Sequence, residues 1–348
     1  MARIIELRSD ADTLPTDAMR DAMARAPVGD DILGEDPSTN ELQAAAASLF
    51  GKEAALLTIS GTMSNQVAVM ALTQRGDEVI VGREAHLYNM EVAGLAMLSQ
   101  VQPRAVDAPN GQYDLDQVRG AVRSSSIQSA ATGLICLENT YNLNAGDVCS
   151  LDNMTRIRSL ASAHGVPVYL DGARLFNAAS ALGVSLSTLA EQADALQVCL
   201  TKGLGCPLGS LLLGSRTFIE KAKRIRQRLG GGMRQSGIIA AAGLVGLQTM
   251  REHMHADHAH ARQLAKGLAG LPGIRLLTAE PQSNIVAIEL AARTLDLDGL
   301  IEQLKARGVL IKKIGERQAR MVTHFQVDTS DVEYVLKSFS DILVTTGA

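Results

Sequence analysis

Residues 195–205, A-L-Q-V-C-L-T-K-G-L-G, place one lysine at the end of an apolar run and directly before a glycine-rich turn. A short apolar run bounded by a turn is typical of a buried strand, so Lys202 is expected at a strand end. Burying an ammonium is costly unless something offsets the lost hydration. Lys202 is therefore a solvated loop residue, half of an ion pair, or a reactive amine.

Similar apolar runs recur through the first 250 residues and alternate with helical patterns. Fully apolar strands that alternate with helices indicate a mostly parallel sheet covered on both faces. The run at 53–59 fits either a strand or the end of a helix that leads into one. We predict strands at 53–59, 78–81, 131–138, 166–171, 195–202 and 209–214, and helices at 63–75, 114–123, 151–164 and 184–192.

From about residue 252 the pattern changes to a histidine-rich helix followed by two further strands and helices. We therefore expect a large domain at 1–251, which includes an N-terminal arm, and a smaller α+β domain at 252–348. The histidines alternate with Asp, Ala and Met on a polar helix, which favours a solvated face over a metal site. They are His253, His255, His258 and His260.

Composition excludes several classes of protein. A net charge of −4 over 348 residues argues against a nucleic-acid or polybasic membrane surface. No apolar run approaches the roughly 20 residues of a membrane-spanning helix, and the charged start lacks the apolar core of a signal peptide. The four cysteines are scattered without a CxxC pair, which makes a disulfide framework or zinc site unlikely. We expect a soluble, cytoplasmic protein.

Two motifs lie where ligands bind in such sheets, beyond the carboxyl ends of the strands. Asp171 ends the run at 166–171, and Arg174 follows three residues later. Asp171 either pairs with Arg174 or faces a protonated ring nitrogen, as pyridoxal phosphate (PLP) requires. The turn Ser60-Gly61-Thr62 opens a helix, where it is either an ordinary N-cap or a phosphate site.

His86 follows the strand at 78–81 and is either a structural histidine or a group that stacks on a ring or acts as a base. No single one of these residues is specific. A phosphate-binding turn, a strand-end acid and a strand-end lysine in this order form a much more specific set. Together they favour a Schiff base between Lys202 and PLP.

These residues resemble the threonine aldolase family of fold-type I PLP enzymes, within the β-eliminating lyase superfamily. The resemblance covers nearly the whole chain. It implies a fold-type I PLP-dependent transferase-like α/β fold, with a mostly parallel seven-stranded sheet between helices and a smaller α+β C-terminal domain. The matching motifs are E-L-R-S-D (6–10), V-G-D-D-I-L-G-E-D-P (28–37), S-G-T-M-S-N-Q (60–66), L-E-N-T (137–140), L-D-G-A-R-L-F-N-A (170–178), T-K-G-L (201–204), L-G-G-G-M-R-Q (229–235) and R-M-V-T-H (320–324).

The resemblance implies roles for particular residues. Lys202 matches the Schiff-base lysine, Asp171 the acid at the pyridine nitrogen, and His86 the histidine stacked on the cofactor ring. Cofactor-binding positions are matched by Ser60, Gly61, Thr62, Arg174 and by Arg234, which reaches the phosphate from a neighbouring subunit. Ser9, Arg174 and Arg320 match the groups that hold the substrate carboxylate. The family also implies a homotetramer, a dimer of dimers with sites at subunit interfaces.

The chain departs from the family along the wall that faces the substrate side chain. Tyr141 stands where the family has a histidine, Leu33 where it often has a tyrosine, and Met90 where it has an aromatic residue. These departures favour a side chain different from that of threonine. Because tyrosine is a poor base at neutral pH, His86 or a water molecule is expected to accept the hydroxyl proton. Tyr141, a further candidate catalytic residue, would instead hydrogen-bond the hydroxyl or fill the pocket.

We therefore expect a carbon–carbon lyase that cleaves an L-β-hydroxy-α-amino acid (threonine, allo-threonine or a bulkier analogue) to glycine and an aldehyde. A second hypothesis keeps PLP but breaks a different bond, by β-elimination, dehydration, racemisation or transamination. A third is a non-catalytic fold relative that acts as a binding protein. No metal is expected.

Overall fold

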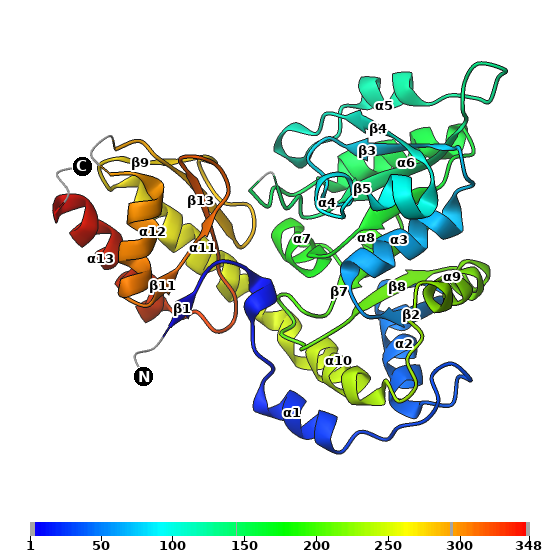
Figure 1. Cartoon of the computed structure of the whole chain (residues 1–348), viewed down its shortest axis with the longest axis horizontal. Coiled ribbons are helices and arrows are strands. Elements are labelled where there is room, and N and C mark those ends of the chain that lie inside the picture. Colours follow the sequence, from blue (N-terminus) through cyan, green and yellow to red (C-terminus); the bar gives the residue numbers. More distant parts are fainter. Residues whose placement is uncertain (1–3, 144, 293–294, 346–348) are drawn as a thin grey trace. The chain divides into compact units, whose positions relative to one another are not determined.

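In the computed structural model, residues 4–143, 145–292 and 295–345 are described. The chain forms two compact units (Figure 1): a large unit, Leu14–Arg251, and a small unit that combines Met1–Thr13 with Glu252–Ala348. The N-terminal segment, expected with the large domain, groups with the C-terminal part because β1 (Ile5–Glu6) pairs in parallel with β11 (Val309–Leu310).

The large unit is built on a seven-stranded sheet, as expected for the fold. Only β8 runs antiparallel to its neighbours, so the sheet is mostly parallel. The strand order is β2 (Ala54–Thr58), β8 (Ser210–Gly214), β7 (Ala195–Cys199), β6 (Val168–Asp171), β5 (Thr132–Glu138), β3 (Glu78–Gly82) and β4 (Gln102–Val106).

All six predicted strands are present, and the run at 53–59 contains the strand β2. The sequence did not reveal β4, because this edge strand, Q-P-R-A-V, is polar and only partly buried. The four predicted helices correspond to α3 (Gly61–Leu72), α5 (Leu115–Ala121), α6 (Leu151–Ala163) and α8 (Leu186–Ala190).

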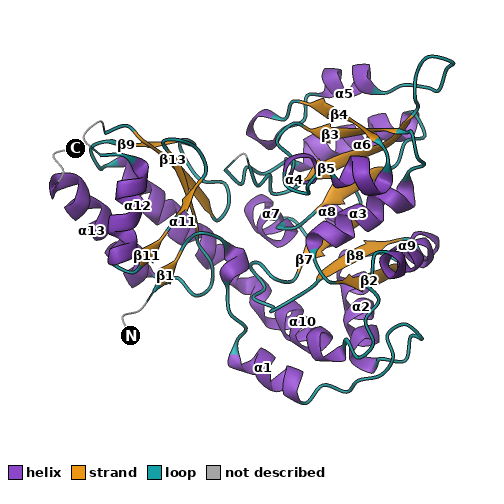
Figure 2. Cartoon of the chain, in the orientation of Figure 1, coloured by secondary structure: helices purple, strands orange, loops and turns teal. Residues whose placement is uncertain are grey.

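The large unit has further helices, most of which pack around the sheet, whereas α1 packs on α10 (Figure 2). They are α1 (Asp17–Ala24), α2 (Pro37–Phe50), α4 (His86–Asn89), η2 (Leu95–Ser99), η3 (Pro109–Gly111), α7 (Leu175–Leu182), α9 (Arg216–Arg228) and α10 (Gly237–Thr249). The helix α3 packs on β7 and β8, which places its first turn near the carboxyl end of β7.

Asp36 ties three segments of the large unit together. Its side chain is fully buried and caps α2 by accepting a hydrogen bond from the Thr39 N–H at 2.8 Å. It also accepts from the N–H groups of Gly29 and Gly237, the latter being the first residue of α10. A charged acceptor with three backbone donors satisfies groups that would otherwise be left unpaired at these helix ends.

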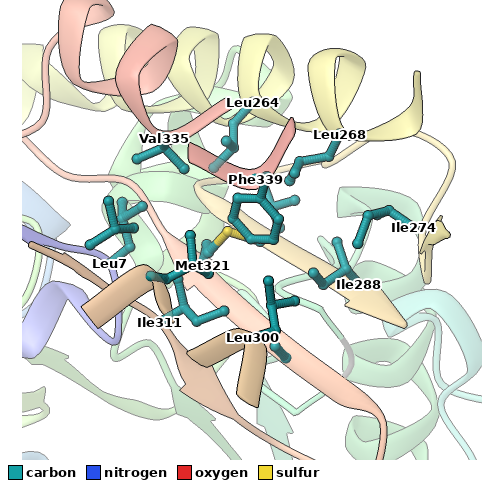
Figure 3. Packing of buried hydrophobic residues seen from close by; sticks show 14 of the residues in the cluster. Leu7, Leu264, Leu268, Ile274, Ile288, Leu300, Ile311, Met321, Val335 and Phe339 are labelled. Carbon is teal, nitrogen blue, oxygen red and sulfur yellow. The ribbon is translucent and has the colours of Figure 1, made fainter. Parts of the chain in front are cut away.

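The small unit has its own apolar core, packed between a four-stranded antiparallel sheet of order β12-β13-β10-β9 and its helices (Figure 3). Fully buried side chains such as Phe339, Leu300 and Ile288 meet in this core. Its elements are η1 (Asp10–Asp12), α11 (Met254–Ala269), β9 (Ile274–Leu276), β10 (Ile285–Leu290), α12 (Leu297–Ala306), β12 (Lys312–Lys313), β13 (Gln318–Val322) and α13 (Thr329–Thr345); η4 (Met250–His253) spans the boundary between the units.

The expectation of a solvated histidine face holds for His253 and His255 but is wrong for His258, which is buried. Burial lowers the pKa of His258 to about 4. Helical periodicity explains the difference, since His258 follows Met254 by one turn and shares its buried face. Within the described residues, no helix has the length and hydropathy to span a membrane.

Replacing Asp36 by alanine should cost about 2–4 kcal/mol of unfolding free energy, because it removes a charged acceptor from buried donors. Burial raises the pKa of Asp36, but the N–H donors outweigh it and hold the pKa below its ordinary value. The contribution is therefore present above about pH 4 and lost as pH falls through the lowered pKa.

Urea denaturation at several pH values checks this prediction. Asp114→Ala, which removes an exposed cap from α5, is the matched control and should cost about 1 kcal/mol. Equal effects of the two variants, or a pH-independent gap between Asp36→Ala and the natural chain, would contradict the role given to Asp36.

Candidate active site

A pocket lies in the large unit beyond the carboxyl ends of β5, β6 and β7. It brings together the predicted residues Lys202, Asp171, His86, Arg174 and the Ser60–Thr62 turn. The lining consists of Ser60, Gly61, Thr62, Asn65, His86, Glu138, Thr140, Asn142, Asp171, Ala173, Arg174, Gln197, Cys199, Thr201 and Lys202.

The Asp171 carboxylate is held in place by three hydrogen bonds. Its Oδ2 accepts a hydrogen bond from Asn65 Nδ2 at 2.8 Å, and its Oδ1 accepts from Gln197 Nε2 at 2.6 Å and from the Ala173 N–H at 3.1 Å. Asp171 is only 3% exposed, so the donors replace water around it. A carboxylate held in this way at a strand end is set to face a cationic group in the pocket.

Lys202 lies in the turn that follows β7. The strand ends at Cys199, and the turn closes through a hydrogen bond from the Gly205 N–H to the Lys202 carbonyl at 2.8 Å. Gly205 has a φ of 70°, a left-handed conformation that glycine adopts without strain. The turn puts the half-buried Lys202 in the pocket lining with Thr201.

The first turn of α3 forms one wall of the pocket. Ser60 is its N-cap, and its hydroxyl accepts a hydrogen bond from the Met63 N–H at 3.1 Å. The backbone N–H groups of a first turn have no acceptor within the helix and carry the positive end of its dipole. A Cβ on Gly61 would lie 2.8 Å from Cys199 Sγ, so the close approach of α3 to β7 requires glycine here.

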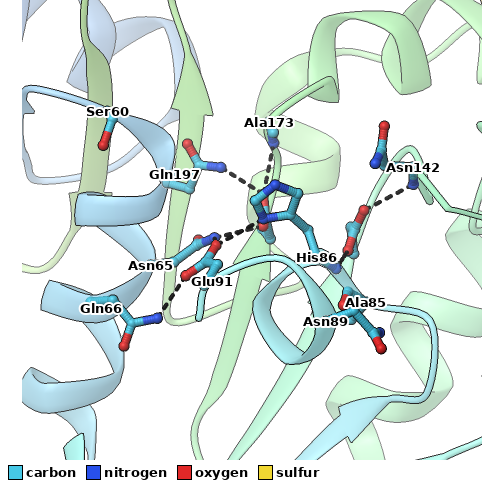
Figure 4. A network of polar contacts seen from close by, with 12 residues as sticks. Ser60, Asn65, Gln66, Ala85, His86, Asn89, Glu91, Asn142, Ala173 and Gln197 are labelled. Atoms are coloured by element: carbon cyan, nitrogen blue, oxygen red, sulfur yellow. Dashed lines mark hydrogen bonds and ion pairs between the residues drawn. The ribbon is translucent and has the colours of Figure 1, made fainter. Parts of the chain in front are cut away.

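His86 begins α4 and is hydrogen bonded through Nδ1 to Glu91 Oε1 at 2.9 Å (Figure 4). This hydrogen bond raises the pKa of His86 above its ordinary value; burial opposes the increase, and the charges of Asp171 and Glu138 add to it. The backbone N–H of His86 donates a hydrogen bond to Glu138 Oε2 at 2.6 Å, and this contact fixes the start of α4.

Arg174 and Glu138 complete the polar lining. The buried Arg174 donates from Nη1 to Asn142 Oδ1 at 2.8 Å, so one side of its guanidinium is held in place. Glu138 accepts from the Asn142 N–H and lies beside Asp171 in the paired strand ends. Burial and the neighbouring charge of Asp171 raise the pKa of Glu138 well above the ordinary carboxyl range.

Tyr141 does not line the pocket, although its neighbours Thr140 and Asn142 do. Its side chain is fully buried, packs edge-to-face on Tyr113 with ring centroids 6.0 Å apart, and ends against Gly82. Burial, followed by the charge of Glu138, raises the pKa of Tyr141 above its ordinary value. A contact between Tyr141 and a substrate stays a prediction.

Three other predicted residues lie on the surface of the large unit rather than in the pocket lining. Leu33 is 67% exposed and Met90 is 49% exposed. Arg234 is exposed and forms an ion pair with Asp30. Ser9 and Arg320 belong to the small unit: Ser9 caps η1, and the buried Arg320 lies in β13. The roles assigned to these five residues stay predictions.

Several lining or supporting residues carried no prediction, although the sequence held signals for some of them. Gln197 is a polar residue inside the apolar strand run A-L-Q-V-C, and Asn65 lies in the quoted motif S-G-T-M-S-N-Q. Glu138 lies in the quoted motif L-E-N-T, and Asn142 follows Tyr141 directly. Glu91 had no signal beyond its place five residues after His86.

The polar groups that line the pocket match the parts of PLP that a protein must bind. The first turn of α3 suits a phosphate, Asp171 suits a pyridinium nitrogen and Lys202 supplies an amine. His86, Glu91 and Asp171 also place ligand atoms within 4.8 Å of one another, a spacing that could hold a metal ion. Their oxygens already accept side-chain hydrogen bonds from Asn65 and Gln197, so we assign no metal to them.

Comparisons with known proteins agree with this chemistry. Residues 6–291 match the family model described as beta-eliminating lyase. The chain is similar to low-specificity L-threonine aldolase 1 of Arabidopsis thaliana, with 42% identity over 99% of this chain and 97% of that protein. It is also similar to the low specificity L-threonine aldolase of Escherichia coli (strain K12), with 40% identity over 95% of this chain and 97% of that protein.

Solved structures share the fold. The threonine aldolase of Leishmania major superposes with a TM-score of 0.82 at 18% identity, covering 97% of this chain and 98% of that one. A serine palmitoyltransferase of Sphingomonas wittichii superposes with a TM-score of 0.79 at 18% identity, covering 99% and 88%. These matches confirm the predicted fold class.

The contact between Tyr141 and Gly82 gives a prediction about packing. A Cβ on Gly82 would lie 2.0 Å from the Tyr141 hydroxyl and 3.0 Å from its Cζ. Gly82→Ala should therefore destabilise the large unit by about 1–3 kcal/mol. Adding Tyr141→Phe removes the closest atom and should recover part of this loss.

Thermal or urea unfolding of the two single variants and the double variant measures the coupling. Gly120→Ala, where a Cβ would meet nothing within 4 Å, is the matched control and should not destabilise the chain. If the stability changes of Gly82→Ala and Tyr141→Phe simply added in the double variant, the alanine methyl at position 82 would not contact the Tyr141 hydroxyl.

Proposed function

Because this chain belongs to the threonine aldolase family of β-eliminating lyases, we propose that it is a PLP-dependent carbon–carbon lyase that cleaves an L-β-hydroxy-α-amino acid to glycine and an aldehyde. The family membership confirms the resemblance read from the sequence. The observation that carries the proposal is the single pocket that gathers Lys202, Asp171, His86, Arg174 and the first turn of α3.

Different residues of the pocket would bind different parts of the cofactor. Lys202 would hold PLP through its amine, the Ser60–Thr62 turn would bind its phosphate, and Asp171 would keep its ring nitrogen protonated. When bound, PLP supplies an electron sink for the bond that breaks at the substrate Cα. The three hydrogen bonds that Asp171 accepts hold its carboxylate in place for this purpose.

The substrate is placed by its carboxylate. The guanidinium of Arg174, already held by Asn142, is suited to bind a carboxylate with two parallel hydrogen bonds. Ser9 and Arg320 are proposed to assist. Fixing the carboxylate sets which substituent of Cα is aligned for cleavage. His86 is proposed to accept the β-hydroxyl proton, so that the Cα–Cβ bond breaks, the aldehyde leaves and Cα is reprotonated to give glycine.

The substrate class follows from the relatives and from the altered wall. The similar proteins are named low-specificity L-threonine aldolases, so threonine and allo-threonine are the first candidates. Tyr141 is buried in the interior, and Leu33 and Met90 are exposed. None of these three side chains lines the pocket, so none of them fills the space beside a substrate side chain there. We propose that it also accepts bulkier side chains, such as that of phenylserine.

Exposed side chains of the large unit and the free thiols bear on assembly and location. The exposed Leu33, Met90 and Arg234 are suited to contact a second copy of the chain, and we propose a homotetramer, a dimer of dimers. The four cysteines are free thiols, which fits a reducing compartment such as the cytoplasm. We further propose that the large unit, residues 14–251, acts as the cofactor-binding domain, and that residues 252–348 together with residues 1–13 act as the smaller domain.

A product-resolved assay tests the reaction. With PLP and threonine, allo-threonine or phenylserine, we expect glycine and the matching aldehyde in equal amounts. Lys202→Ala should lose at least about a thousandfold in rate, because a cofactor-bound amine has no substitute in the pocket. Lys305→Ala, at an exposed lysine of α12, is the control and should retain full activity.

Formation of a 2-oxo acid and ammonia in place of glycine would instead support elimination or transamination by the same site. A purified protein that takes up no PLP and releases no product would support a binding function. Either result would overturn the aldolase assignment.

A further inference from the structure

Glu91 is a buried carboxylate that none of the proposed reaction steps uses. Its side chain is fully shielded and the residue is 5% exposed, although a buried carboxylate is costly without partners. Three side-chain nitrogens face it: Asn65 Nδ2 at 2.6 Å and His86 Nδ1 at 2.9 Å reach Oε1, and Gln66 Nε2 at 2.6 Å reaches Oε2 (Figure 4).

This arrangement decides which nitrogen of His86 carries a proton. An ionised carboxylate only accepts hydrogen bonds. The amide groups of Asn65 and Gln66 can only donate from the nitrogens that face Glu91. His86 Nδ1 must therefore also be a donor, and in the neutral ring the lone pair is left on Nε2.

The same network links Glu91 to Asp171. Asn65 Nδ2 donates to both carboxylates, and Asn65 Oδ1 accepts from the Tyr169 hydroxyl at 2.7 Å, which fixes the orientation of the amide. Because the amide cannot rotate without losing three contacts, Glu91 and the cofactor-facing acid Asp171 are held as one unit.

The backbone after Glu91 is bent at an energetic cost. Val92 and Ala93 have φ values of 50° and 57°, and Val92 is 93% exposed, so its own side chain gains nothing from packing. A left-handed β-branched residue is unfavourable. Such strain persists where the surroundings require it, often beside a functional site. Here the bend accompanies the inward placement of Glu91.

We propose that Glu91 is a positioning residue that holds His86 in its Nδ1-protonated form, so that Nε2 is the ring atom that accepts the proton of a substrate hydroxyl. The proposal deepens the proposed function and rests on it for the identity of the substrate. The other charged groups that face His86 are Asp171 and Glu138, and Lys202 lines the same pocket. Glu91 differs from them because its contact is a direct hydrogen bond to the ring.

The test is a pH titration of the full chain, labelled with ¹⁵N-histidine, by NMR. His86 is assigned from the signal missing in His86→Asn, and the exposed His164 serves as an internal reference. We expect neutral His86 to carry its proton on Nδ1 and its pKa to lie above the ordinary value for histidine. In Glu91→Gln the pKa of His86 should fall and both tautomers should appear, and Glu91→Asp should restore part of the increase.

The matched control is Glu220→Gln, which neutralises an exposed carboxylate far along the chain in α9 and should leave the His86 titration unchanged. In the kinetic assay, the acidic limb of the kcat/KM profile should move to lower pH in Glu91→Gln. Its loss of rate should stay below the roughly 10²–10⁴-fold expected for His86→Asn.

Three results would overturn the proposal: an Nε2-protonated neutral ring in the natural chain, a His86 titration unchanged by Glu91→Gln, or a rate loss without movement of the pH profile. The first needs only the His86→Asn variant used for assignment and no change at Glu91, so it decides the matter even if Glu91→Gln does not fold. A natural chain with the expected titration but no aldehyde or glycine would reject the proposed function and leave the positioning role standing.

Discussion

The Asp171 carboxylate, buried at the end of β6, is the constraint on which the rest of the site depends. It stays buried because Asn65, Gln197 and the Ala173 N–H satisfy its oxygens. Asn65 comes from α3 and Gln197 from β7. One anion therefore fixes the helix whose first turn is suited to phosphate and the strand whose following turn carries Lys202.

A second layer of polar groups sets the chemistry around that anion. Glu91 orients His86, and Asn142 orients Arg174. These partners come from loops and helix starts beyond the strand ends, where the backbone is free to turn side chains inward. These hydrogen bonds hold the His86 and Arg174 side chains in place, which would reduce the cost of ordering them when a ligand binds.

Much of this could be predicted from the sequence because the signals were local. Apolar runs marked six strands of the large sheet, and strand-end positions marked Asp171 and Lys202. The polar edge strand β4 gave no such run. Glu91 could not be found because its partners Asn65 and Gln66 lie 26 and 25 residues away, and only tertiary packing brings them together. Tyr141 was expected in the substrate wall because the family has a histidine at this position; its side chain packs against Gly82, and its contact with a substrate stays a prediction.

The central claim is that Lys202 is the amine that holds PLP in this pocket. Reduction of the PLP-loaded protein with borohydride, followed by peptide mass spectrometry, tests it most directly. The account predicts a single phosphopyridoxyl adduct on Lys202, with none formed in Lys202→Ala. An adduct on another lysine, or no adduct in a protein that has taken up PLP, would contradict it.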